Sequence, residues 1–196
     1  MPPLTPDPFY GQEARARLCS RFIIHVFGCP EDHPTKGRVF LPALPLYIAK
    51  ILWGAALQPC ISTLALVLIL RLKARIPSSH GNSGHRLFVS AIMIATKTLV
   101  DETYTNKSWK QIIGPGFSLR ELNQMEREMC RFLEWDFLVE NQDLIAFEKI
   151  VVAGFSRDSR DYPIIPLALI SKRFRQALSI GHSEYLCLRR YVAHFD

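Results

Sequence analysis

Four residues near the beginning of the chain have side chains that bind metal ions, namely Cys19, His25, Cys29 and His33. Structural zinc sites draw their ligands from short Cys-Cys and His-His pairs, because this spacing lets four ligands converge on one ion. Cysteine and histidine alternate here instead, and their spacing fits no such module. We therefore expect no metal site in this segment and no resident cofactor in the protein.

The short motifs of nucleotide binding, zinc proteolysis, serine hydrolysis and protein phosphorylation are absent from the sequence: GxGxxG, GxxxxGK[ST], HExxH, GxSxG and the HRD/DFG pair. The acidic residues between 121 and 136 fall on a helix surface that we expect to be solvated, so they do not suggest an acid/base pair. The five cysteines are odd in number and form no CxxC, which favours reduced thiols. These observations predict a protein that is not an enzyme and has no small-molecule substrate.

Two charged residues are distinguished by their apolar neighbours. Lys97 is the only charge between residues 87 and 100. Because burying an unpaired ammonium group is costly, its side chain must reach the rim of the core or meet an acid. Glu126 borders the apolar stripe of another expected helix. The residues alone leave two interpretations open, an internal Lys97–Glu126 ion pair or contacts of both with a docking helix of a partner.

Helical periodicity dominates the chain between about residues 46 and 155, and no run of alternating polar and apolar residues indicates a sheet. Ser118 and Glu121 form a capping box that opens one helix. Ser108 fits a second capping box, opening a short helix that Gly114 stops, and Asn141 can cap a further helix. We expect five helices in one all-α domain.

Residues 51–70 contain no charge and are followed by Arg71, Lys73 and Arg75, the length and basic flank of a membrane span. Pro59 in the middle should break a helix, which would leave two shorter pieces at 46–57 and 61–76, both suited to a helical core. A pair of core helices is therefore the main prediction, and a small membrane protein with one span at about 51–70 is the alternative.

The two ends of the chain are less regular. Residues 1–40 indicate a loosely ordered leader, 41–155 the helical domain, and 156–196 a tail in which 164–178 could form one further helix. The net charge of +6 comes from the ends, at +5 for residues 1–84 and +3 for 156–196, whereas 85–155 carries −2. A nucleic-acid groove in the acidic middle is therefore not expected.

The middle of the chain resembles a cyclin box, and in particular the Pcl/PHO class of fungal cyclins. The resemblance rests on an ordered series of segments: ATKTL at 95–99, Asp101, NKSW at 106–109, FSL at 117–119, LNQME at 122–126 and FLEWDF at 132–137. It covers about residues 40–152. What it implies is a single five-helix cyclin box that binds and activates a cyclin-dependent kinase, in the nucleus, the cytoplasm or both.

The resemblance also implies which residues bind the kinase. A lysine on the third box helix and a glutamate on the fourth mark the site in this family, and the matching residues are Lys97 and Glu126. Trp135 and Phe137 occupy the family's aromatic or apolar positions at the end of that helix, where they would help to form the kinase-facing surface. For these two residues, ordinary packing in the core is the competing interpretation.

Overall fold

The computed structural model describes residues 7–32, 41–81, 83–159, 161–166 and 170. Seven α-helices and no strand lie in this part of the chain, which confirms the predicted all-α class. Six of the helices lie between residues 44 and 155, where five are expected, and α1 precedes them. In chain order they are α1 (Glu13–Phe27), α2 (Leu44–Gly54), α3 (Pro59–Arg75), α4 (Gly84–Leu99), α5 (Asn106–Ile113), α6 (Leu119–Phe132) and α7 (Asn141–Phe155).

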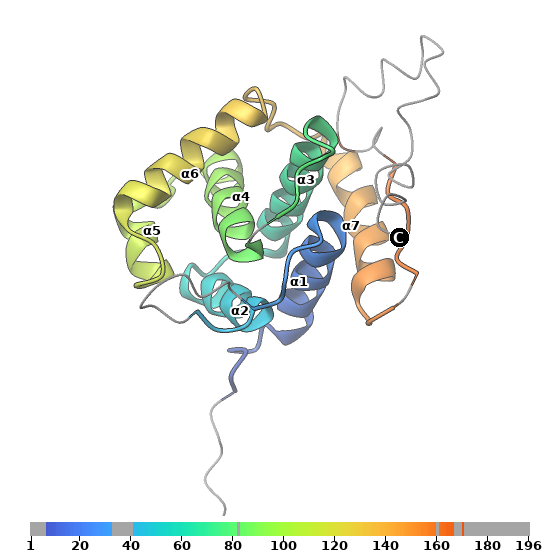
Figure 1. The fold of residues 1–196 in the computed structure, drawn as a ribbon, viewed down its shortest axis with the longest axis horizontal. Coiled ribbons are helices and arrows are strands. Elements are labelled where there is room, and N and C mark those ends of the chain that lie inside the picture. The colour runs from blue at the N-terminus through green and yellow to red at the C-terminus, as the bar shows by residue number, and fades with distance from the viewer. Residues whose placement is uncertain (1–6, 33–40, 82, 160, 167–169, 171–196) are drawn as a thin grey trace, which may run out of the picture.

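Helix α4 lies in the middle of the bundle (Figure 1). It packs against α3, α6, α1 and α2, while α7 packs against α1 and α3 on the other side of the molecule. Every residue from 88 to 96 is buried, as expected for a helix that is apolar around most of its circumference. Lys97, the next residue, is exposed at the edge of the core.

The uncharged stretch 51–70 is divided between two helices. Helix α2 ends at Gly54, residues 55–58 turn the chain, and Pro59 is the first residue of α3. Proline fits this position because its missing N–H would have no partner in the first turn. Across the described residues, we find no helix with the length and apolarity needed to cross a bilayer. The predicted pair of core helices is therefore the interpretation that the structure supports.

We expect the Pro59→Ala substitution to be tolerated, with a change of at most about 1 kcal/mol in the free energy of unfolding. The reason is that Pro59 begins α3 and interrupts no helical hydrogen bond. Chemical denaturation of the purified variant would measure this. A continuous helix through 55–58 is the contrary outcome, and an increase in helical circular dichroism with loss of cooperative unfolding would reveal it.

The structure confirms one of the predicted helix starts and shifts the other two. Ser118 and Glu121 form the expected capping box, in which the Ser118 N–H donates to the Glu121 carboxylate at 2.7 Å and lowers the pKa of that group. The short helix begins earlier than predicted, because Thr105 rather than Ser108 is its cap and accepts the Ser108 N–H at 3.1 Å. Asn141 is the first residue of α7 and not its cap, which is Glu140.

The expectation of a loosely ordered leader does not hold for residues 13–27. They form α1, and this helix packs against α2, α3, α4 and α7. Its buried stripe of Ala16, Cys19, Ile23 and Val26 has helical spacing. Arg17 and Arg21 lie on the solvent side of α1 and interrupt the apolar residues in the sequence. The helical spacing of the buried residues is therefore hard to recognise from the sequence.

The thiols of Cys19 and Cys29 are part of the core, where burial raises their pKa values to about 12 and about 11. His25 lies against the rings of Phe155 and Tyr162, with ring centroids 5.7 and 4.9 Å away. His33 falls outside the described residues. Where the structure describes the chain, no group of three or more His, Cys, Asp or Glu residues is placed to hold a metal ion.

The predicted helix at 164–178 lies mostly outside the described residues, and residues 161–166 are not helical. This segment returns along α7, where Tyr162 stacks on Phe155 with the ring centroids 4.6 Å apart.

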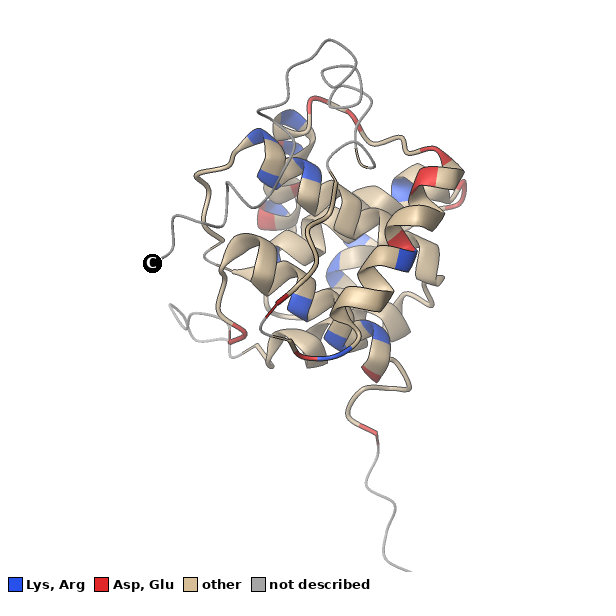
Figure 2. Cartoon of the chain, turned by 90° about the vertical axis from the view of Figure 1, so that its right-hand side faces the viewer, with Lys and Arg blue, Asp and Glu red and all other residues tan. Residues whose placement is uncertain are grey.

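On the face drawn in Figure 2, basic and acidic residues are interspersed over the helices and do not form one continuous basic stripe.

Candidate functional site

Lys97 and Glu126 meet at the edge of the bundle. The Lys97 Nζ atom lies 2.5 Å from Glu126 Oε1, and the two side chains are 31% and 16% exposed. Lys97 is in the last turn of α4, where the negative end of the helix dipole favours a cation. The two side chains thus form the internal ion pair, which is one of the two interpretations that the residues alone leave open. Their partial exposure leaves them accessible to a partner, so the internal pair and the partner contact are compatible.

Two asparagines complete this group of polar side chains. Asn106 Oδ1 accepts from Lys97 Nζ at 2.6 Å, and Asn106 Nδ2 donates to Glu126 Oε2 at 2.5 Å and to Asn123 Oδ1 at 2.8 Å. We call Lys97, Asn106, Asn123 and Glu126 the polar cluster. The asparagines were not among the predicted site residues. Asn106 lies in the NKSW segment, but nothing local indicated that its side chain would reach both charges.

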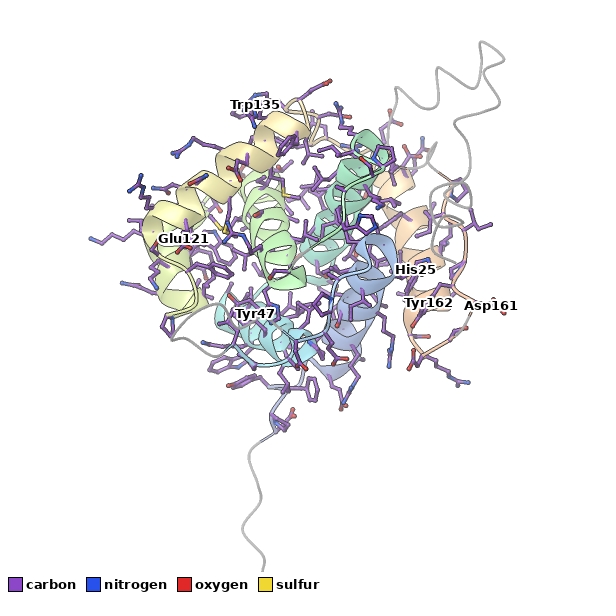
Figure 3. All side chains as sticks on the ribbon, in the orientation of Figure 1. His25, Tyr47, Glu121, Trp135, Asp161 and Tyr162 are labelled. Atoms are coloured by element: carbon purple, nitrogen blue, oxygen red, sulfur yellow. The ribbon has the colours of Figure 1, made fainter. Side chains whose placement is uncertain are left out.

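Trp135 projects from the end of α6 into solvent (Figure 3), and 72% of its surface is exposed. The chain turns sharply here because Glu134 and Trp135 both adopt left-handed backbone conformations, with φ values of 52° and 60°. For Trp135 the structure therefore excludes packing in the core. Phe137 is half-buried against the core, and its ring centroid lies 5.8 Å from that of Trp135.

A buried arginine holds the segment that carries Trp135. Arg71 is 3% exposed, and its guanidinium donates to the carbonyls of Asp136 at 2.7 Å and Leu138 at 2.9 Å, and to that of Ile170. Burial lowers the pKa of Arg71, and the nearby Asp136 carboxylate opposes this shift. Because three carbonyls are tied to one rigid group, the backbone on both sides of Phe137 has little freedom.

The structure places Arg71 inside α3 and in the core, not in the basic flank of a membrane span. One sequence signal could have revealed its burial. Arg71 follows Leu64 and Val67 at helical spacing, so it continues a buried stripe of α3. A charge in register with such a stripe must find partners in the interior.

Four further large apolar side chains are exposed after Trp135 in the described residues, namely Leu138, Ile145, Val152 and Ile164. Ile145 and Val152 are seven residues apart on α7 and therefore share one face of that helix. A partly buried polar cluster together with an exposed tryptophan is typical of a surface that binds another protein.

The described part of the chain is thus a helical bundle whose surface carries a partly exposed polar cluster and an exposed tryptophan. The sequence profile of the family described as Cyclin matches residues 40–137, which is half of the chain. The chain therefore belongs to the cyclin family, as the resemblance indicated. Lys97, Glu126, Trp135 and Phe137 all lie within the matched range, whereas α1 and α7 lie outside it.

Three curated relatives are from Saccharomyces cerevisiae. PHO85 cyclin-2 is 32% identical over 112 residues, which is 55% of this chain and 36% of the relative. PHO85 cyclin-9 is 31% identical over 164 residues, or 78% of this chain and 50% of the relative. PHO85 cyclin-1 is 29% identical over 118 residues, or 59% and 41%. The chain thus spans half or less of the length of these relatives.

Proposed function

We propose that this chain is a regulatory subunit that binds and activates a cyclin-dependent Ser/Thr kinase of the kind for which the PHO85 cyclins are named. One observation carries the assignment of the binding surface. The Lys97–Glu126 pair is placed at the rim of α4 and α6 with part of its surface exposed, and Trp135 projects from the end of the same α6. We call this surface, with Phe137, the α4–α6 face.

The proposed mechanism is positional. A kinase of this group is active when a glutamate on its mobile regulatory helix pairs with the lysine that positions ATP. A rigid helical surface packed against that regulatory helix turns it inward. Arg71, by fixing the backbone beside Phe137, supplies part of the rigidity that this task requires.

The kinase contributes the catalysis in this proposal, and the chain by itself transfers no phosphate. The complex would act in the nucleus, the cytoplasm or both. Neither nucleic acid nor a small-molecule substrate is part of the proposed activity.

The direct test mixes the purified chain with the yeast PHO85 kinase and measures the dissociation constant and the phosphorylation of a Ser/Thr peptide. We expect a stable complex and an increase in peptide phosphorylation over the kinase alone. The chain without the kinase should show no phosphorylation. Activity of the chain after every co-purified kinase has been removed, or the absence of a complex with any cyclin-dependent kinase, would overturn the proposal.

We expect Trp135→Ala to weaken kinase binding by about 30-fold or more, the loss typical of a tryptophan at the centre of an interface. The free energy of unfolding should change little because the ring is solvent-exposed, and alanine keeps the same backbone strain as tryptophan. Titration calorimetry and thermal unfolding would measure the two quantities. Trp53→Ala is the matched control, because Trp53 is 58% exposed on α2, outside the α4–α6 face. Equal losses in both variants would contradict the assignment of Trp135.

A further inference from the structure

The amide of Asn106 joins the two charges of the polar cluster. Its oxygen accepts from the Lys97 ammonium at 2.6 Å, while its nitrogen donates to the Glu126 carboxylate at 2.5 Å. An amide can do both at once because it carries an acceptor and donors on one planar group. The second donor of the nitrogen goes to Asn123 at 2.8 Å, so the contacts on both sides fix the orientation of the amide.

These contacts are separate from the start of helix α5. Asn106 is the first residue of α5, but the capping side chain is Thr105, which accepts the Ser108 N–H at 3.1 Å. The Asn106 side chain therefore does not cap the helix. It brings a third element, α5, to a pair that is otherwise formed only by α4 and α6.

A partly exposed ion pair between two long side chains is weakly ordered by itself. Its Coulomb energy is screened by water, and holding lysine in one conformation costs side-chain entropy. Hydrogen bonds from a short side chain anchored on a helix reduce the number of conformations that Lys97 and Glu126 can adopt. A pair that is already ordered before docking loses less entropy when a partner binds.

We propose that Asn106 is a positioning residue that holds Lys97 and Glu126 in the conformation that binds the kinase. This inference rests on the proposed function of the α4–α6 face and deepens it. Asn106 acts through the two charged residues and not through a contact of its own with the kinase. Asn123 supports it by accepting the remaining amide hydrogen.

The binding experiment measures Asn106→Ala in two backgrounds. In the otherwise wild-type chain, we expect kinase binding to weaken about tenfold, as for the loss of a charge-assisted hydrogen bond. In the Lys97→Ala/Glu126→Ala background, the same substitution should change binding less than twofold, because the residues through which it acts are gone. Thr105→Ala is the matched control, since it weakens the start of α5 without removing the Asn106 amide, and its binding should stay within twofold of wild type.

A second measurement needs no kinase. Nuclear spin relaxation of the Lys97 side chain should show a restricted ammonium in the wild-type chain and in Thr105→Ala, and a mobile one in Asn106→Ala. Equal mobility in all three proteins would overturn the positioning role. An equal loss of kinase binding from Asn106→Ala in both backgrounds would also overturn it, because Asn106 would then contact the kinase directly. If the wild-type chain binds no kinase, the proposed function fails, and the relaxation result alone decides whether Asn106 orders the pair.

Discussion

Exchanging the charges of Lys97 and Glu126 is expected to preserve the fold and to weaken kinase binding strongly. The double variant Lys97→Glu/Glu126→Lys can re-form an ion pair across the same gap between α4 and α6. However, the negative charge then comes from α4 and the positive charge from α6. The kinase therefore meets each charge at the position that the opposite charge occupies in the wild-type chain. Disrupting a desolvated charged contact at an interface costs about 2–5 kcal/mol, or roughly 30- to 5,000-fold in the dissociation constant.

The single variants separate stability from binding. Lys97→Glu places a second carboxylate beside Glu126, so we expect both the melting temperature and kinase binding to fall. Adding Glu126→Lys should recover the melting temperature but not the binding. The exposed pair Glu13–Arg17 on α1 provides the control, because its exchange also leaves the net charge unchanged and lies outside the α4–α6 face. If the exchanged pair binds within threefold of wild type, Lys97 and Glu126 serve only the internal ion pair.

The largest effect on stability is expected from Arg71→Met. Methionine fills much of the same volume but removes the donor from two partly buried hydrogen bonds, to the carbonyls of Asp136 and Leu138, and from the buried one to Ile170. Losing these three hydrogen bonds of a buried charged group should cost about 3–5 kcal/mol in total. For a chain of this size, that corresponds to a fall of roughly 6–20 °C in the melting temperature. Differential scanning calorimetry would measure it.

Two variants test the cause of this effect. Arg71→Lys keeps the charge but not the planar fork that reaches three carbonyls, so its loss should be intermediate. Arg86→Met removes an arginine whose side chain is 44% exposed and lies 4.0 Å from Glu121, and should change stability by no more than about 0.5 kcal/mol. A fall below 1 kcal/mol for Arg71→Met would show that the segment around Phe137 does not depend on this arginine. Kinase binding by Arg71→Met, measured below its melting temperature, should weaken as well because Trp135 loses its fixed support.

The sequence alone predicted the features that depend on residues close together in the chain. The capping box of Ser118 and Glu121 needs only residues three positions apart, and Pro59 limits α3 through its own backbone. The apolar residues of α4 cover most of its circumference, a pattern typical of a central helix. The family resemblance added Lys97 and Glu126 as a pair, and the structure brings them into contact.

Local sequence patterns did not predict the cap of α5 or the presence of α1. Ser108 and Thr105 have side chains that can both cap α5, and the structure shows that Thr105 does so. The apolar stripe of α1 is interrupted in sequence by arginines. Only the packing of α1 against α2, α3, α4 and α7 shows that this stripe is buried.

What the sequence determined by itself was the helical class, most helix positions and, through the family motifs, the residues of the candidate site. The tertiary structure decided how these residues are presented. Trp135 faces solvent because two consecutive left-handed residues turn the chain after α6, and Arg71 is buried because three carbonyls from distant segments surround it. Asn106 reaches Lys97 and Glu126 because α5 packs against α6 beside the end of α4. Such contacts join residues far apart in the chain, and their geometry depends on the packing of whole helices, which no local pattern specifies.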